Sequence, residues 1–278
     1  RTYTEADLRD TVATLSEMIS KEQYPYPLDE DVESLIGQFE EIRDSLIWAP
    51  GQVIWDDPSS IEEGKEAAVM HEALHRKLQT LEKELLIESA YFVVRERAVE
   101  ATKKMVEKGV RVRILTNSLA SNDVVAAHGG YASGRKQLIE NGAEIYELRP
   151  DAVSRTVTEK RVFAGGKSKA ALHTKAIVFD RESVFIGSYN LDPRAAEINT
   201  EAGLYVESPE LARQVVAYMD EGVLPENSYR VELDDDGDLV WITEKDGQEV
   251  RYTNEPESTF WQRFVAGFVK MLGIEDQL

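Results

Sequence analysis

Several polar residues in the second half of the chain have the types and the spacing of a phosphate-binding site. His173 and Lys175 stand two apart in an apolar run that predicts a β-strand, so both side chains should point to one face of a sheet. Ser188 and Asn190 follow the next predicted strand with the same spacing and offer a hydroxyl and an amide donor. Glu201 could hold the second ring nitrogen of His173 and fix its tautomer. Together these groups provide a nucleophile, a cation and two neutral donors, which suits a tetrahedral phosphate.

A second signature competes with this one. The segment His71-Glu72-Ala73-Leu74-His75 matches the H-E-x-x-H pattern, in which two histidines on one helical face bind zinc and the glutamate acts as general base. A zinc protease needs a third ligand, and the other two histidines, His128 and His173, do not stand at a suitable spacing. We therefore favour an exposed helix with incidental histidines and expect no metal.

The composition restricts the class of partner. The 278 residues include 52 acidic and 32 basic side chains, which gives a net charge of −20, and 42% are hydrophobic. This balance excludes global disorder and argues against a broad nucleic-acid-binding surface, which needs clustered Lys and Arg. The chain has no cysteine, which excludes disulfides, a thiolate zinc site and a cysteine nucleophile. A phosphate-bearing substrate must therefore be bound by a local pocket, and the basic cluster at 155–169 could attract it.

The alternation of apolar patterns predicts an α/β fold, a mixed β-sheet flanked by helices on both faces. The strands that would carry the site are expected at 85–94, 110–117, 144–148, 173–179, 184–187 and 203–207. Helices are expected at 5–20, 31–47, 61–84, 96–108, 131–141 and 209–218. We expect three regions: a helical segment at 1–50, the α/β domain at 51–225, and a small β-meander with a helix at 226–278. The last helix, 258–272, carries an aromatic stripe that should pack against the sheet or, alternatively, lie on a bilayer.

The order of the site residues resembles the HKD motif of the phospholipase D superfamily. The run is His173-x-Lys175-x4-Asp180-x6-Gly187-Ser188-x-Asn190, with Glu201 eleven residues further on. Its setting is similar to the second half of bacterial cardiolipin synthases of the C type. The matching segments are 87–92, 113–118, 172–180, 185–194 and 274–278.

The resemblance implies phosphatidyl transfer to a lipid hydroxyl, or phospholipase D-type hydrolysis, through a phosphohistidine and without a cofactor. It implies His173 as nucleophile or general acid, Glu201 as its orienting group, and Asp180 in a supporting hydrogen-bonding role. The phosphate would be bound by Lys175, Ser188 and Asn190. The further candidates near this site are Asp192, Arg194 and Asn199, together with His128, which lies on a predicted loop after a strand.

Active sites of this superfamily use two HKD motifs, and this chain has one. None of the other histidines begins a complete His-x-Lys-x4-Asp run: His71 has no Lys two residues on, His75 has Lys77 but Glu82 in place of the Asp, and His128 is followed by Gly-Gly-Tyr. One histidine forms the phosphohistidine while a second must protonate the leaving alkoxide. We therefore expect a second HKD half, either an N-terminal half that is missing here or a second copy in a homodimer. The first residue is Arg1 rather than Met, which favours a fragment in which 1–50 links two halves.

Two other functions stay open at this point. The chain could form a homodimeric nuclease of the same superfamily, although its acidic surface makes nucleic acid an unlikely substrate. It could also be a non-catalytic module whose His173 pocket only binds an anion. The resemblance implies a bacterial protein that acts on phospholipid, in the cytoplasm or peripheral to the inner membrane. The sequence has no apolar run long enough to span a bilayer.

Overall fold

The computed structural model of the chain describes residues 32–59, 69–152 and 171–272. The chain divides into two compact units, of which one holds Arg1–Leu46 with Val157–Ser168 and the other holds the remaining residues. The described element of the first unit is helix α2 (Val32–Ser45), which confirms the helix expected at 31–47. The helix expected at 5–20 and the basic cluster at 155–169 lie outside the described residues.

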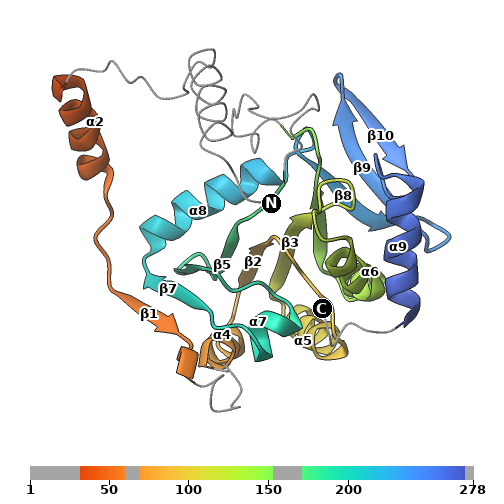
Figure 1. The fold of residues 1–278 in the computed structure, drawn as a ribbon, viewed down its shortest axis with the longest axis horizontal. Coiled ribbons are helices and arrows are strands. Elements are labelled where there is room, and N and C mark those ends of the chain that lie inside the picture. Colours follow the sequence, from red (N-terminus) through yellow and green to blue (C-terminus); the bar gives the residue numbers. More distant parts are fainter. Residues whose placement is uncertain (1–31, 60–68, 153–170, 273–278) are drawn as a thin grey trace, which may run out of the picture. The chain divides into compact units, whose positions relative to one another are not determined.

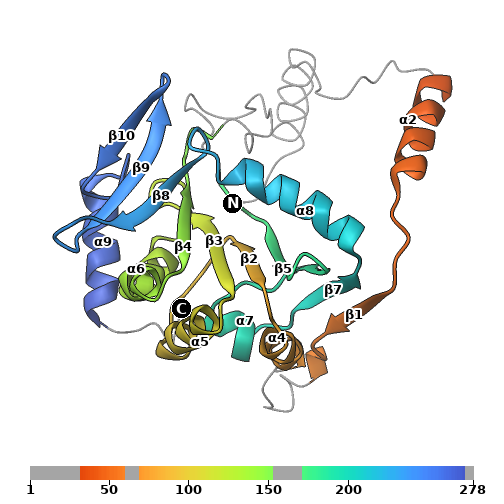
Figure 2. The same cartoon turned by 180° about the vertical axis from the view of Figure 1, so that it is seen from behind.

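The larger unit is built on one mixed sheet of ten strands (Figures 1 and 2). The strands, in their order across the sheet, are β1 (Gly51–Trp55), β7 (Ala202–Glu207), β6 (Ser183–Gly187), β5 (Lys175–Phe179), β2 (Glu84–Ser89), β3 (Arg111–Asn117), β4 (Glu144–Leu148), β8 (Ser228–Leu233), β9 (Leu239–Lys245) and β10 (Gln248–Tyr252). Neighbours β2, β3 and β4 are parallel, and every other pairing is antiparallel. Strands β2 and β5 are buried along their whole length because helices cover both faces of the sheet there.

Helices cover the two faces unequally. The described helices of this unit are α4 (Val69–Gln79), α5 (Glu96–Glu107), α6 (Val125–Glu140), α7 (Pro193–Glu197), α8 (Pro209–Gly222) and α9 (Phe260–Leu272). Helices α4, α5 and α6 contribute to the large core cluster on one face, with Met70, Leu74, Tyr131 and Leu138 among its buried members. On the other face α8 packs Val216 and its neighbours on β5 and β6. This confirms the expected α/β layering. None of the helices in the described ranges is long and apolar enough to cross a bilayer.

Helix α6 begins at Val125, six residues before the start that the sequence suggested. Two glycines of the helix, Gly129 and Gly134, serve packing. A Cβ atom on Gly129 would lie 2.9 Å from Cγ1 of Val269, and one on Gly134 would lie 2.3 Å from Cγ1 of Val94. The glycines therefore permit close approach of α9 and of the segment after β2, at some cost in helix propensity.

One further expectation needs correction, and the structure adds detail to two others. The strand expected at 85–94 ends at Ser89, and the residues after it leave the sheet, where the amide of Val93 donates to the carbonyl of Leu191 (2.8 Å). At the other end of the chain, the meander continues the main sheet, because β8 pairs with β4. The aromatic stripe of α9 does not enter the core: α9 packs along α6 through Ala266 and Val269, and Phe264 is 53% exposed.

Candidate active site

Lys175 is the first residue of β5, and His173 precedes the strand by two residues, so the strand expected at 173–179 begins two residues later. The ammonium nitrogen of Lys175 donates to the main-chain carbonyl of His173 (2.9 Å) and lies 3.5 Å from its ring nitrogen Nδ1. The His173 side chain is exposed, whereas Lys175 is buried. The entry to β5 is held by Asn117 at the end of β3, whose amide group bonds both the N–H (2.7 Å) and the carbonyl (3.0 Å) of Leu172. The backbone before His173 is therefore fixed by a buried side chain from a neighbouring part of the sheet.

Ser188 and Glu201 meet beside the end of β6. The hydroxyl of Ser188 donates to the Glu201 carboxylate and accepts the N–H of Ala202 (3.0 Å), while its own N–H donates to the Ala202 carbonyl (2.9 Å). This proximity needs glycine at the strand end. A Cβ atom on Gly187 would lie 2.5 Å from the Ala202 carbonyl oxygen, which is a backbone clash. The Glu201 carboxylate thus bonds Ser188, where the sequence led us to expect a bond to the ring of His173.

The site is a buried cation among carboxylates. Burial lowers the pKa of Lys175, and the charges of Glu201, Asp192 and Asp123 act in the opposite direction. Burial also raises the pKa of Glu201, against its hydrogen bonds from Ser188 and Asn199. An ammonium group at this position is the natural partner for a phosphate oxygen that enters the site.

The remaining candidates of this wall lie around α7. Asp192 caps that helix by accepting the N–H of Ala195 (2.7 Å), and burial raises the pKa of its carboxyl. Asn199 follows the helix and hydrogen-bonds Glu201, while Arg194 is exposed. Asn190 is half-buried, and its side-chain oxygen has no hydrogen-bond partner among the described residues. An amide with a buried, unpartnered end is available to a ligand, because rotating the group would present its donors.

Asp180 is not brought together with His173. It follows β5 at the far end of the strand, where its carboxylate accepts the backbone N–H groups of Glu82 (3.0 Å), Lys83 (2.7 Å) and Glu84 (2.8 Å). The motif's aspartate therefore joins the start of β2 to the end of β5. Its hydrogen bonds support the strand that carries His173 and Lys175 and make no contact with the site itself.

Asp180→Ala is expected to lower the free energy of unfolding by about 1–3 kcal/mol, because backbone donors lose their acceptor. Asp246→Ala is a matched control, since Asp246 has the same φ of 53° and an exposed side chain. Comparing urea unfolding of the two variants removes the cost of placing alanine at positive φ. Equal losses of unfolding free energy in the two variants would show that the three hydrogen bonds from backbone N–H groups to Asp180 contribute nothing to stability.

Asp56 is a structural member of the site that the sequence did not reveal. Its carboxylate accepts the N–H of Met70 (3.0 Å) at the described start of α4 and the N–H of Glu201 (3.1 Å), and its own N–H donates to the Glu201 carbonyl (2.9 Å). Asp56 is buried, and it fixes the backbone of Glu201 from β1. In the sequence it reads only as part of a break, Asp56-Asp57-Pro58, and no local pattern links it to Glu201.

Glu201→Gln is expected to raise the stability of the fold at neutral pH. The ionised carboxylate is disfavoured by burial and by Asp192 and Asp56, so its pKa in the folded state is raised above the ordinary 4.5. The wild-type chain therefore loses stability as pH rises through that raised pKa, whereas the Glu201→Gln variant, which has no ionisable group there, does not. The gain should vanish below pH 4.5, where the carboxyl is protonated in both states. Thermal unfolding across this pH range tests the prediction. The control is Glu207→Gln, since Glu207 is exposed and is the last residue of β7, the strand that Glu201 precedes. A gain in stability that persists in acid would contradict the prediction.

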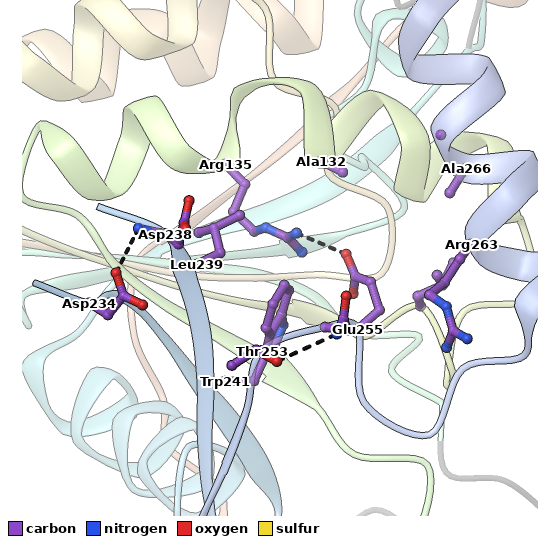
Figure 3. A pocket seen from close by; sticks show the side chains of 13 residues that line it. Ala132, Arg135, Asp234, Asp238, Leu239, Trp241, Thr253, Glu255, Arg263 and Ala266 are labelled. Carbon is purple, nitrogen blue, oxygen red and sulfur yellow. Dashed lines mark hydrogen bonds and ion pairs between the residues drawn. The ribbon is translucent and has the colours of Figure 1, made fainter. Parts of the chain in front are cut away.

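His128 lies elsewhere, and the expectation that it borders the site is wrong. It stands within α6 rather than on a loop, is 1% exposed, and its Nε2 lies 3.4 Å from the Glu255 carboxylate. Glu255 also receives the guanidinium of Arg135 (2.8 Å), as Figure 3 shows. This buried network borders a cavity of about 440 Å³ between β9 and the helices α6 and α9.

The H-E-x-x-H segment lies on α4. The Nδ1 atom of His71 is 2.9 Å from the hydroxyl of Tyr189, and the ring of His71 stacks on that of His75. In the described part of the chain, no three His, Asp or Glu side chains are grouped so that they could hold a metal ion. The motif thus packs one histidine against the residue between Ser188 and Asn190.

Comparisons with known proteins identify the family. Residues 74–222 match the family described as cardiolipin synthase, PLD-like domain. The chain is 35% identical over 231 residues to cardiolipin synthase C of Escherichia coli, covering 83% of this chain and 48% of that protein. It is 28% identical to an uncharacterized protein of Helicobacter pylori, covering 88% of this chain and 47% of the other. The chain thus spans about half the length of these relatives.

Among solved structures, phosphatidylserine synthase of Haemophilus influenzae matches with a TM-score of 0.52 and 15% identity, covering 96% of this chain and 62% of that one. This match concerns the fold. The family match covers more than half of the chain and includes His173, Lys175, Ser188 and Glu201. The chain therefore belongs to the PLD-like domain family of cardiolipin synthases.

Proposed function

We propose that the chain supplies one half of a phosphatidyl-transferring active site in which His173 is one of two reacting histidines. The observation that carries the proposal is the grouping of His173, Lys175 and the Ser188–Glu201 pair at one edge of the sheet in a member of this family. The relative from E. coli is a cardiolipin synthase about twice as long as the matched region, which supports a lipid hydroxyl as acceptor and a second half as partner.

The reaction would take two displacements at phosphorus. A ring nitrogen of His173 attacks, the bond from phosphorus to the leaving alkoxide breaks, and the second histidine donates a proton to that alkoxide. An acceptor hydroxyl then attacks the phosphohistidine, gives its proton to the second histidine and releases His173. The proposal assigns the non-bridging oxygens to Lys175, Ser188 and Asn190, which offset the charge that develops on them.

The other residues would act through these groups. Glu201 accepts the Ser188 hydroxyl and would accept a hydrogen bond from the His173 ring, Asn199 hydrogen-bonds this carboxylate, and Asp192 caps the neighbouring helix α7. Asp180 keeps β5 in register from its far end. No step of this scheme requires a metal. A lipid substrate would place the reaction at a membrane surface, in the bacterial cytoplasm or at the inner membrane.

The concentration dependence of activity tests the proposal and identifies the source of the second histidine. With phosphatidylglycerol as donor, product formation is measured by mass spectrometry over a dilution series of the chain. Activity that rises with the square of concentration indicates a homodimer. Activity that requires an added polypeptide with a second His-x-Lys-x4-Asp indicates two different halves. Turnover by a monomer of this chain alone, or no turnover in either arrangement, would refute the proposal.

A further inference from the structure

Helix α9 presents an unusual surface for a chain of net charge −20. Its exposed large apolar side chains are Phe260 (74%), Trp261 (66%), Phe264 (53%), Phe268 (48%) and Met271 (72%). At the α-helical period these residues fall within an arc of roughly 100° on one side of the helix. The opposite side, through Ala266 and Val269, packs on α6. The exposed arc is therefore a continuous apolar stripe, which we call the α9 stripe.

The rings of the α9 stripe stack on one another, so the surface is ordered. The ring of Phe264 lies at 6.5 Å from Phe260, 5.4 Å from Trp261 and 6.5 Å from Phe268, with interplanar angles of 22° or less. Contiguous exposed apolar surface of this kind marks a contact with another body. Something therefore covers the stripe when the protein works.

The charge of α9 indicates what covers it. The helix sequence, FWQRFVAGFVKML, has two basic residues and no acidic residue, although the chain has 52 acidic residues. An apolar arc with aromatic rings, in a helix whose charged residues are all basic, is the composition of helices that lie in the head-group layer of a bilayer. Anionic lipid would repel acidic residues. Each of the other helices of comparable length in the described part contains at least one acidic residue, and α9 contains none: the other helices are α2, α4, α5, α6 and α8.

The position of α9 relative to the site favours the same partner. The side chain of Gln262, in the first turn, donates to the carbonyl of Leu119 (3.2 Å). Leu119 follows β3 by two residues, and the last residue of β3, Asn117, holds Leu172 next to His173. The aromatic start of α9 and the reacting histidine thus belong to the same edge of the sheet. A bilayer that covers the stripe would lie along the edge at which lipid head groups must reach His173.

We propose that the α9 stripe is a docking surface for the head-group layer of a phospholipid bilayer. The inference deepens the proposed function, because it states how a lipid substrate comes to the site. Binding to a bilayer is measured without turnover, so a failure of this inference and a failure of the catalytic proposal can be told apart.

Vesicle sedimentation with the whole chain tests the inference. Vesicles of phosphatidylcholine mixed with phosphatidylglycerol should carry the wild-type chain into the pellet, and Phe264→Ser/Phe268→Ser should weaken this partition by about tenfold or more. Val53→Ser/Trp55→Ser is the matched control, since these two residues are exposed on β1 (both 60%) and form a second apolar patch. Absence of wild-type binding, or loss of binding in the β1 variant with retention in the α9 variant, would overturn the proposal.

Tryptophan quenching gives a second measurement that does not depend on how a double variant folds. Lipids brominated on their acyl chains should quench part of the fluorescence of the bound wild-type chain, and Trp261→Phe should remove that part while binding persists. Quenching that survives Trp261→Phe would place Trp48 or Trp55 at the lipid instead and overturn the proposal. A change in sedimentation mass in lipid-free solution on Phe264→Ser/Phe268→Ser would show that a second copy, rather than a bilayer, occupies the stripe.

Discussion

Replacing His173 by asparagine is expected to lower phosphatidyl transfer by on the order of 10⁴-fold or more, in the assembly that contains both reacting histidines. The amide of asparagine cannot form the covalent bond to phosphorus or transfer the proton. Because His173 is exposed, the substitution should change the free energy of unfolding by no more than about 0.5 kcal/mol. The measurement is kcat/KM for product formation, with urea unfolding of the same preparations.

The control for this prediction is His75→Asn. His75 is also an exposed histidine, on α4, and its Nδ1 atom lies 3.4 Å from the side-chain nitrogen of Gln79. It should retain wild-type activity. Detection of a phosphorylated histidine in a His173→Asn preparation would show that the second histidine is the nucleophile, and His173 would then be the general acid. Near-normal turnover by His173→Asn would remove it from the reaction.

Replacing Arg135 by methionine is expected to lower the free energy of unfolding by about 3–5 kcal/mol, because it leaves buried carboxylates without their counter-charge. Arg135 is 3% exposed and bonds Glu147 (2.6 Å) and Glu255 (2.8 Å). Glu147 is fully buried and also accepts bonds from Tyr131 (2.9 Å) and Trp241 (2.9 Å). Urea unfolding at neutral pH measures the loss, and Arg135→Met/Glu147→Gln should recover part of it by removing one unpaired charge.

The loss of stability caused by Arg135→Met should depend on pH. Burial acts to raise the pKa of Glu255, but the charges of Arg135 and His128 outweigh it and hold that pKa at about 2, below the ordinary 4.5. A depressed pKa means that this carboxylate stabilises the fold above pH 4.5 and that its contribution is lost as pH falls towards 2. The gap in stability between wild type and Arg135→Met should therefore narrow over this range. A gap that is constant with pH would show that lost packing around Arg135, rather than charge, sets the effect.

The local sequence was sufficient for the elements that carry the reacting groups. Period-two spacing predicted that the side chains of His173 and Lys175 lie on one side. In the structure Nζ of Lys175, the first residue of β5, lies 3.5 Å from Nδ1 of His173. Gly109 and Gly142 were expected to end helices, and both have positive φ, 89° and 90°. These features depend on neighbours within a few residues, so a sequence pattern contains them.

The sequence was misleading where a glycine or an aromatic residue has its partner far away. In the structure, the helix expected at 131–141 already includes Gly129, and the absence of a side chain there leaves room for Val269, 140 positions later. The aromatic stripe of the last helix suggested core packing, since periodicity indicates an apolar face without indicating what that face meets. His128 looked like a loop residue near the site and proved to be buried against Glu255.

The sequence by itself determined the chemistry available to this protein: one histidine, one lysine and their donors in the order of an HKD motif, and a single copy of that motif. Only the tertiary structure decided how these groups are held. Asp180 ties two strands together away from the site, Asp56 fixes Glu201 from β1, and Glu201 bonds Ser188. The reason is that hydrogen bonds between residues 96 to 145 positions apart follow from the pairing of strands, and that pairing is a property of the folded sheet rather than of any local pattern.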